Sequence, residues 1–333
     1  MNVLGIETSC DETAAAVVAG GTAVLCSVVA SQVDRHRQYG GVVPELASRM
    51  HLSAIVPVVS RAIEEAGVAI DAVAVTQGPG LVGALLVGFA FAKAFAFGRR
   101  LPLVGVDHLE GHLQSVLLNP KPPPFPLAAL LASGGHTGIY YLAAQSRYEL
   151  MGQTRDDAAG EAYDKVAKML GLSYPGGAEI DRLAREGDPR RLQFTRPYLD
   201  KEGFDFSFSG IKTAVQRHLQ SQPAPEPADI AAGFQEAVID VLVHKLLHAA
   251  RVKNCRHVAV VGGVAANSRL RERIGAEAAA RGLVVHIPPI ALCGDNAAMI
   301  AALGYHRLQR GPTLALDADV YSRAPRKVFA QNS

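Results

Sequence analysis

The sequence contains few cysteines, and none of its four forms a Cys-x-x-Cys pair. A zinc ribbon needs closely spaced cysteine pairs, and a small secreted fold needs many cysteines to build a disulfide framework. Neither class fits this chain. The cysteine usage fits a reducing compartment, so we expect a cytoplasmic protein. The four cysteines are Cys10, Cys26, Cys255 and Cys293.

The sequence also lacks a secretory leader and a clear membrane span. Residues 1–8 are typical of the start of a strand rather than of a basic segment followed by an apolar one. The most apolar run covers residues 81–98, whereas a membrane helix needs about 20 apolar residues. This run carries Lys93 and several glycines. We interpret it as a helix buried between layers and expect no membrane insertion.

A strong net charge is missing as well, because the formal charge is +2 at pH 7. A value this close to neutral neither requires nor excludes a nucleic-acid partner, since a local basic patch is enough. The Gly-x-Ser-x-Gly signature of serine hydrolases is absent, and nothing suggests covalent catalysis by a cysteine. Composition therefore leaves the function open.

The length and a repeated order of elements predict two α/β lobes. The 333 residues exceed the roughly 250–300 at which a single core stops growing. Three strands followed by helix, strand, helix, strand and helix occur twice, with long insertions in the second copy. The proline-rich residues 119–126 separate the copies. We expect a first lobe at 1–118, a second at 127–310 and a tail at 311–333 that could return to the first lobe.

Hydrophobic periodicity and turn residues place the elements of each copy. Ligands of such sheets bind at the carboxyl ends of strands, where the glycine-rich turns lie, so we expect a cleft lined by these turns. Strands are predicted at 3–7, 13–18, 23–30, 72–76, 103–106, 127–133, 138–143, 148–152, 258–261 and 284–287. Helices are predicted at 44–66, 81–98, 157–170, 178–186 and 228–252. Further helices are predicted to begin at 108, to run from after 267 to 281, and to run from 294–296 to about 310, with 34–43 and 187–212 irregular.

Two histidines four residues apart, His108 and His112, form the first candidate site. On a helix this spacing places both imidazoles on one face, where they could supply two ligands to a transition metal. The order differs from the His-Glu-x-x-His of zincins, because Glu110 stands midway between the histidines. Two ordinary histidines on a half-buried helix are the alternative.

Asp295 offers a third ligand. It lies at the start of the last predicted helix, where a simple N-cap is the alternative role. If the two lobes face each other, its carboxylate can meet His108 and His112 across the cleft. Two histidines and one carboxylate with open positions form a recognised catalytic metal site.

Several loops are suited to a phosphate or a ribose. The glycines of 133–137 and 262–267 let backbone N–H groups approach an anion, the second loop at a helix N-terminus. Asp164 can accept hydrogen bonds from ribose hydroxyls, and Gly177 permits close backbone contact. The acidic loop 7–13 could meet a phosphate or its cation. The alternative is a β-turn for 133–137 and a helix cap for Asn267. For Asp164 it is a solvated helix face, and for the loop 7–13 it is a solvated turn.

Together these segments resemble the TsaD family, the tRNA N6-adenosine threonylcarbamoyltransferases once labelled O-sialoglycoprotein endopeptidases. The resemblance covers nearly the whole chain, and so many long motifs in order are highly specific. The segments are 5–13 (GIETSCDET), 39–49 (YGGVVPELASR), 78–88 (GPGLVGALLVG), 108–112 (HLEGH), 133–137 (SGGHT), 160–165 (GEAYDK), 174–177 (YPGG), 206–213 (FSFSGIKT) and 262–267 (GGVAAN).

The resemblance implies the actin/hexokinase-like (ASKHA) fold, with two ribonuclease-H-like lobes around a central cleft. It implies transfer of a threonylcarbamoyl group from threonylcarbamoyl-adenylate to N6 of adenosine 37 in tRNAs that read ANN codons, with release of AMP. The implied metal ligands are His108, His112 and Asp295. The family metal is usually Fe²⁺, although these residue types accept Zn²⁺ equally and Mg²⁺ stays open. The implied adenylate-binding residues are Leu131, Ala132, Ser133, Gly134, Gly135, Asp164, Gly177, Asp181 and Asn267.

The family chemistry is acyl transfer from a mixed anhydride, and a general base would help the weak purine amine, with Asp11 and Glu12 as weak candidates. We expect the bacterial arrangement without a fused kinase after residue 333. This arrangement adds a TsaB-like paralogue, docking through the helices near 44–66 or 81–98, and a TsaE-like ATPase. A metalloprotease and a non-catalytic nucleotide-binding partner are the alternatives.

Overall fold

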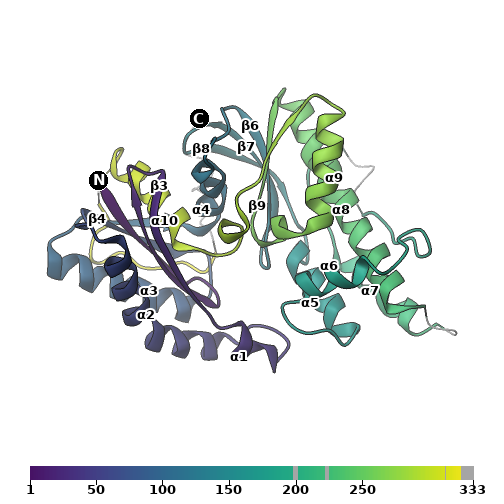
Figure 1. The fold of residues 1–333 in the computed structure, drawn as a ribbon, viewed down its shortest axis with the longest axis horizontal. Coiled ribbons are helices and arrows are strands. Elements are labelled where there is room, and N and C mark those ends of the chain that lie inside the picture. The colour runs from purple at the N-terminus through teal and green to yellow at the C-terminus, as the bar shows by residue number, and fades with distance from the viewer. Residues whose placement is uncertain (198–201, 222–224, 312, 324–333) are drawn as a thin grey trace. The chain divides into compact units, whose positions relative to one another are not determined.

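The computed structural model describes residues 1–197, 202–221, 225–311 and 313–323. Their internal contacts divide them into two compact units. The first unit contains residues 1–122, 294–311 and 313–323, and the second contains the described residues of 123–293. The division falls within the proline-rich segment, and each unit is built around one five-stranded sheet (Figure 1).

The sheet of the first unit has the strand order β3-β2-β1-β4-β5. The first three strands pair antiparallel, whereas β4 pairs in parallel with β1 and with β5. Side chains alternate along β1, so that Leu4 and Ile6 join the apolar core formed with α2 and α3. The strands are β1 (Asn2–Glu7), β2 (Glu12–Ala19), β3 (Ala23–Ser31), β4 (Ala72–Gly78) and β5 (Leu103–Asp107). The helices are α1 (Val33–Arg37), α2 (Pro44–Ala66), α3 (Val82–Arg99), α4 (His108–Ser115), the 3-10 turn η1 (Val116–Leu118) and α10 (Ala297–Leu308).

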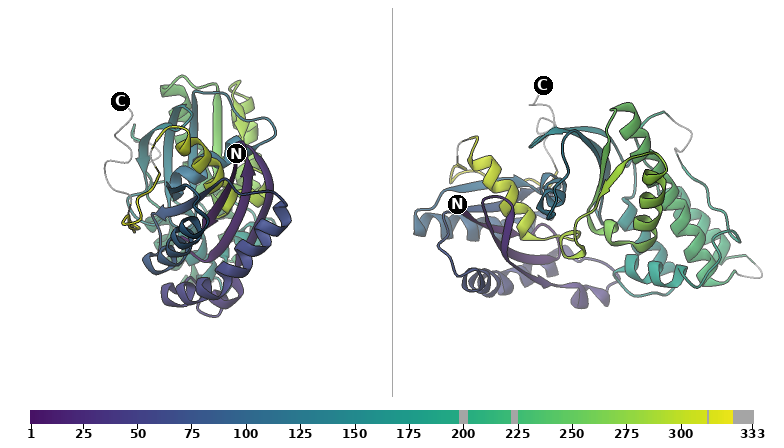
Figure 2. Two further views of the ribbon diagram at one scale, coloured as in Figure 1. Left: turned by 90° about the vertical axis from the view of Figure 1, so that its left-hand side faces the viewer. Right: turned by 45° about the horizontal axis from the view of Figure 1, so that its top comes forward.

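The last helix, α10, belongs to the first unit, whereas we expected residues up to 310 in the second lobe. Figures 1 and 2 show α10 (yellow) beside the purple strands of the first sheet. A Cβ on Gly5 of β1 would lie 2.2 Å from the carbonyl oxygen of Ala297. A Cβ on Gly304 would lie 2.3 Å from the Cβ of Ala74. Glycine at these two positions lets the helix pack directly on the sheet, which a sequence pattern does not reveal.

The described part of the tail, residues 313–323, continues along the first unit. The backbone N–H of Leu314 donates to the carbonyl of Leu103 at 2.7 Å. The N–H of Tyr321 donates to the carbonyl of Gln77 at 3.0 Å. The tail therefore contacts the start of β5 and the end of β4, and Tyr321 reaches Asp107 at the start of α4.

Helix α3 is long and apolar enough to span a membrane, as the core helix of a soluble protein also can be. The expectation of a helix buried between layers is wrong, because only 33% of its span is buried. Phe89 and Ala92 pack into the core with α2 and the sheet. Leu86 and Phe97 are exposed, so α3 keeps one apolar face uncovered in this chain.

The sheet of the second unit has the order β10-β9-β6-β7-β8 and the same pairing pattern, which confirms the predicted duplication. The long helix α8 supplies much of the core, and α5, α6 and the aromatic side chains of Phe206 and Phe208 complete it. The strands are β6 (Leu127–Ala132), β7 (Thr137–Ala144), β8 (Arg147–Gln153), β9 (His257–Val261) and β10 (Val284–His286). The helices are α5 (Ala159–Met169), α6 (Gly176–Ala184), α7 (Ser209–Leu219), α8 (Pro227–Val252), η2 (Gly263–Ala266), α9 (Ser268–Ala279) and η3 (Ile290–Leu292).

Two helices lie in or begin within segments that we predicted to be irregular, and tertiary contacts explain both. In α1 the ring of His36 is fully buried, and its Nδ1 accepts from the N–H of Val43 at 3.2 Å. At the start of α7 the Oδ1 atom of Asp156 accepts from the N–H groups of Phe208 (2.8 Å) and Ser209 (3.3 Å). Helix propensity is a local property, so it does not reveal partners that are distant in the sequence.

Candidate metal centre

The helix that carries both histidines begins where β5 ends, and Asp107 sets its start. The Oδ1 atom of Asp107 accepts hydrogen bonds from the N–H groups of Leu109 (2.9 Å) and Glu110 (3.1 Å), which lack partners within the helix. Its Oδ2 atom accepts from the hydroxyl of Tyr321 in the tail at 2.9 Å. Burial raises the pKa of Asp107, although these hydrogen bonds oppose the shift.

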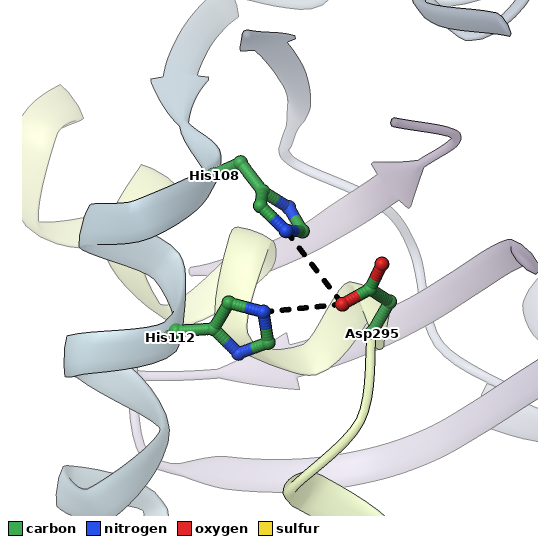
Figure 3. A group of neighbouring side chains, drawn as sticks. All are labelled: His108, His112 and Asp295. Atoms are coloured by element: carbon green, nitrogen blue, oxygen red, sulfur yellow. Dashed lines mark hydrogen bonds and ion pairs between the residues drawn. The ribbon is translucent and has the colours of Figure 1, made fainter. Parts of the chain in front are cut away.

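His108 and His112 lie on one face of α4, as the spacing predicts (Figure 3). Their ring centroids are 4.7 Å apart in an edge-to-face arrangement. Both Nε2 atoms point to the same carboxylate oxygen of Asp295, at 3.6 Å from His108 and 3.1 Å from His112. The ring of His112 is fully buried and that of His108 nearly so.

Asp295 does not cap the last helix. The Oδ1 atom of Asn296 accepts from the N–H of Met299 at 3.0 Å, so Asn296 is the N-cap of α10. The carboxylate of Asp295 is directed at the two histidines instead (Figure 3). All three side chains belong to the first unit, which corrects the expected placement of Asp295 on the opposing lobe. The close packing of α10 on β1 is the reason.

These three side chains could hold one metal ion. Their ligand atoms all lie within 4.8 Å of one another, and two imidazole nitrogens with a carboxylate oxygen suit Fe²⁺ or Zn²⁺. Among the described residues, Nδ1 of His112 is buried without a hydrogen-bond partner. The ligand atom that this ring offers is Nε2, which lies 3.1 Å from Oδ1 of Asp295.

Buried acidic groups around this position favour a cation. Burial alone lowers the pKa of His108, but the charges of Glu7 and Asp295 raise it to about 9. Burial and the charges of Asp295 and Asp11 raise the pKa of Glu12 to about 9. The Oδ2 atom of Asp11 is buried and has no hydrogen-bond partner in the described chain. A bound cation would compensate this concentration of carboxyl groups.

Of the two candidate bases, Asp11 lies in the acidic loop after β1 and Glu12 begins β2. With a pKa near 9, Glu12 holds its proton at neutral pH unless a nearby cation lowers that pKa. The base role therefore stays a prediction for both residues. Burial and the charge of Asp11 raise the pKa of Cys10 well above its ordinary value, so this thiol stays protonated and is a poor nucleophile.

Glu110 is directed at α10 and not at the metal ligands. Its Oε2 atom accepts from Nη2 of Arg307 at 2.5 Å, and Nη1 of Arg307 donates to the carbonyl of Gly105 at 2.8 Å. Burial raises the pKa of Glu110 to about 7, with Arg307 opposing the shift. A metalloprotease of the zincin type needs a free glutamate beside its first histidine, so this ion pair counts against the protease alternative.

The predicted adenylate-binding residues lie in the second unit, at the end of β6 and in the loop after it, within α5 and α6, and at the N-cap of α9. The N–H of Gly160 donates to the carbonyl of Ser133 at 3.1 Å, which holds α5 against the loop after β6. The N–H of Gly176 donates to Oδ1 of Asp164 at 2.7 Å, which holds the start of α6 against α5. The predicted set consists of Leu131, Ala132, Ser133, Gly134, Gly135, Asp164, Gly177, Asp181 and Asn267.

Asp181 and Asn267 are tied to the start of α9. The Oδ1 atom of Asn267 accepts from the N–H of Leu270 at 2.9 Å, and its Nδ2 donates to Oε1 of Gln235 at 2.7 Å. Asp181 accepts from the hydroxyl of Ser268 at 3.0 Å. Asn267 thus has the capping role that was its alternative, and ligand binding by both residues stays a prediction.

Three glycines of the predicted set have open space beside them. A Cβ on Gly134, Gly135 or Gly177 would meet no other atom within 4 Å. Gly160 differs, because its Cβ would lie 2.6 Å from the carbonyl oxygen of Ser133. Open backbone at the first three positions suits close approach of a ligand, whereas Gly160 is needed for packing.

A family model described as TsaD, tRNA N6-adenosine threonylcarbamoyltransferase, matches residues 23–302. The chain belongs to the TsaD family. A relative from Desulforapulum autotrophicum that bears the name of this transferase is 59% identical, over 97% of this chain and 99% of its own length. A TsaD relative of the same name from Geobacter metallireducens is 57% identical, over 96% of each chain.

A solved structure of full-length HypF, in its phosphate- and nucleotide-bound form, has a similar fold. The TM-score is 0.65 at 13% identity, over 93% of this chain and 47% of the HypF chain. Likeness at so low an identity speaks for the fold alone. Together with the TsaD family and the duplicated sheets, it confirms the predicted actin/hexokinase-like fold.

Sequence reasoning missed the neighbours that hold this TsaD site in place. Glu7 ends β1 with a fully buried side chain, and it contacts Nδ1 of His108 at 3.0 Å. Tyr321 reaches Asp107 from the tail. The signal for Glu7 was a carboxylate directly after an apolar strand, but nothing in the sequence pairs it with a histidine a hundred residues away.

Proposed function

We propose that this chain transfers a threonylcarbamoyl group from threonylcarbamoyl-adenylate to N6 of adenosine 37 in tRNAs that read ANN codons, with release of AMP. The observation that carries the proposal is the buried cluster of His108, His112 and Asp295 in a chain 59% identical to a relative named for this activity. A protein that only bound nucleotide would not need such a cluster.

The reaction is acyl transfer from a mixed anhydride. AMP is a good leaving group, so no nucleophilic side chain is needed, in keeping with the raised pKa of the Cys10 thiol. The attacking amine is weak because its lone pair is delocalised into the purine. A general base helps this step, and Asp11 and Glu12 are the candidates.

The second unit binds the adenylate. The backbone of 131–135 and of Gly177 approaches the nucleotide where a side chain would interfere, and Asp164 accepts from the ribose hydroxyls. Asp181 in α6 and Asn267 at the N-cap of α9 contact the same ligand. In the first unit His108, His112 and Asp295 hold a divalent ion. When bound, that ion supplies positive charge to oxygens on which negative charge develops.

Fe²⁺ is the ion that we propose for this site, with Zn²⁺ and Mg²⁺ as alternatives. Two imidazoles and one carboxylate match the ligand preferences of iron and zinc better than those of magnesium, which favours oxygen ligands. Elemental analysis of protein purified without oxygen should find close to one iron per chain. Zinc in its place would assign the site to Zn²⁺.

We further propose a cytoplasmic assembly with a TsaB-like paralogue and a TsaE-like ATPase. Helices α2 and α3 pack together and carry strongly exposed apolar residues, with Leu52 66%, Val56 56% and Leu86 44% exposed. Apolar side chains this exposed on neighbouring helices are typical of a protein interface. The paralogue docks on this face, and the ATPase joins the resulting complex.

A reconstituted reaction tests the function directly. The purified chain and its two partners are incubated with unmodified tRNA and threonylcarbamoyl-adenylate, and nucleosides are measured by mass spectrometry. The wild type should form threonylcarbamoyladenosine, and folded His112→Ala should form little or none. A wild-type reaction that consumes the adenylate without modifying tRNA would contradict the proposal.

A further inference from the structure

Glu7 is a buried carboxylate to which the proposed reaction assigns no role. Its side chain is 0% exposed at the end of β1. The Oε1 atom accepts from the N–H of Ser9 at 2.5 Å, and Oε2 accepts from the hydroxyl of Thr76 at 2.6 Å. The third neighbour is Nδ1 of His108, 3.0 Å from Oε2.

Neutral donors alone do not balance a buried carboxylate. In the part of the chain that the structure describes, no lysine or arginine pairs with Glu7, and His108 is its only ion-pair partner. The negative charge of Glu7 is therefore offset either by a proton on His108 or by a cation bound on the other side of its ring.

We propose that Glu7 is a positioning residue for the metal ligand His108. Its carboxylate accepts the Nδ1 proton, which selects the tautomer with a free Nε2 lone pair and fixes the plane of the ring. The Nε2 atom of that ring lies 3.6 Å from Oδ1 of Asp295, on the side where the ion binds. The inference rests on the proposed metal site.

The two histidines differ in this respect. His108 has a carboxylate beside Nδ1, whereas Nδ1 of His112 is buried without a hydrogen-bond partner among the described residues. Glu7 therefore acts on one ligand only. Glu7 brings its carboxylate from the end of β1, so that His108 is aimed by a second element and not by α4 alone.

Metal affinity of variants distinguishes positioning from a purely structural role. The metal-free wild type, Glu7→Gln and Thr76→Val are titrated with Co²⁺ against a coloured chelator. We expect Glu7→Gln to bind Co²⁺ about 10- to 100-fold more weakly and with an altered visible spectrum, because ring support of this kind contributes that much to affinity. Thr76→Val removes another bond of Glu7 and spares the contact with His108, so its affinity should stay close to wild type.

A second variant keeps the test decisive if Glu7→Gln does not fold. Glu7→Asp keeps the charge but withdraws the carboxylate by one methylene, and its affinity should fall between those of the wild type and Glu7→Gln. Wild-type affinity in every folded Glu7 variant would overturn the inference and leave the metal site standing. Equal losses in Thr76→Val and Glu7→Gln would also overturn it. A wild type that binds no Co²⁺ would instead refute the metal site itself.

Discussion

Two adjacent residues at the start of α10 have separate roles. Asn296 caps the helix, and Asp295 faces the histidines. Because the cap does not depend on Asp295, a substitution there should remove a metal ligand and leave α10 in place. The metal binding of an Asp295 variant can therefore be tested while α10 keeps its cap.

Asp295→Ala should lose most of its bound metal and lower the stability of the metal-free protein by about 1 to 3 kcal/mol. Its carboxylate pairs with Nε2 of the buried His112 and helps to raise the pKa of His108, so its removal takes this partner from both buried rings, although it relieves repulsion with Glu12. Elemental analysis and urea unfolding of the metal-free forms measure both effects. Asp34→Ala, at a side chain 89% exposed, is the control and should change neither. A full complement of metal in Asp295→Ala would refute this ligand.

At the scale of elements, α4 is held at its start by a cap and by the tail. Asp107 accepts two backbone N–H groups of α4 through one oxygen and the Tyr321 hydroxyl through the other. The metal ligand His108 is the next residue. Stability of this helix start and metal binding should therefore change together.

Asp107→Ala should destabilise the protein by about 1 to 2 kcal/mol, because it removes a helix cap and leaves the Tyr321 hydroxyl without this partner. Tyr321→Phe removes only the second contact and should cost about 1 kcal/mol. Urea unfolding at neutral pH measures both. A larger loss in Tyr321→Phe than in Asp107→Ala would contradict this account of the helix start.

The start of α7 should loosen in acid. Burial raises the pKa of Asp156, but its hydrogen bonds from Ser207, Phe208 and Ser209 outweigh that effect and lower the pKa below its ordinary value. A carboxyl group with a lowered pKa stabilises the fold fully above its unfolded pKa, and this stabilisation is lost as pH falls through the folded pKa.

Hydrogen exchange of residues 206–212 tests this prediction. In the wild type, protection of these amides should fall as pH drops below the ordinary aspartate range. Asp156→Asn should show weaker protection at neutral pH and little further change in acid. An identical pH profile in both proteins would mean that another group controls the segment.

Local patterns predicted most elements but few of their partners. Helix α2 matches its predicted span of 44–66, because Pro44 and Gly67 are explicit start and stop signals. The His108 and His112 spacing likewise specified a shared helix face. The position of Asp295 depended on the packing of α10 against Gly5, a contact between the two ends of the chain. Such packing leaves no periodic signal in the sequence.

At the scale of the whole molecule, the duplicated order of strands was readable because each copy repeats the same elements. The end of the second copy could not be predicted from the sequence, because α10 returns to the first unit. The exposed apolar residues of α2 and α3 are the second feature of the whole molecule. These residues need a partner that the sequence of one chain does not contain.

Leu52→Asp should weaken binding of the TsaB-like paralogue, because it places a charge in the proposed apolar interface. Leu316→Asp, at another exposed leucine, is the control and should bind as the wild type does. Analytical ultracentrifugation of each variant with the paralogue measures the difference. Equal binding by both variants would place the interface elsewhere.

Nucleosides of tRNA from cells depleted of this protein give the most direct test of the central claim. Depletion should abolish threonylcarbamoyladenosine, and wild-type protein or Asp34→Ala should restore it. Asp295→Ala should fail to restore it, because the reaction needs the intact cluster of His108, His112 and Asp295. Modified adenosine that persists after depletion, or that returns fully with Asp295→Ala, would contradict the account.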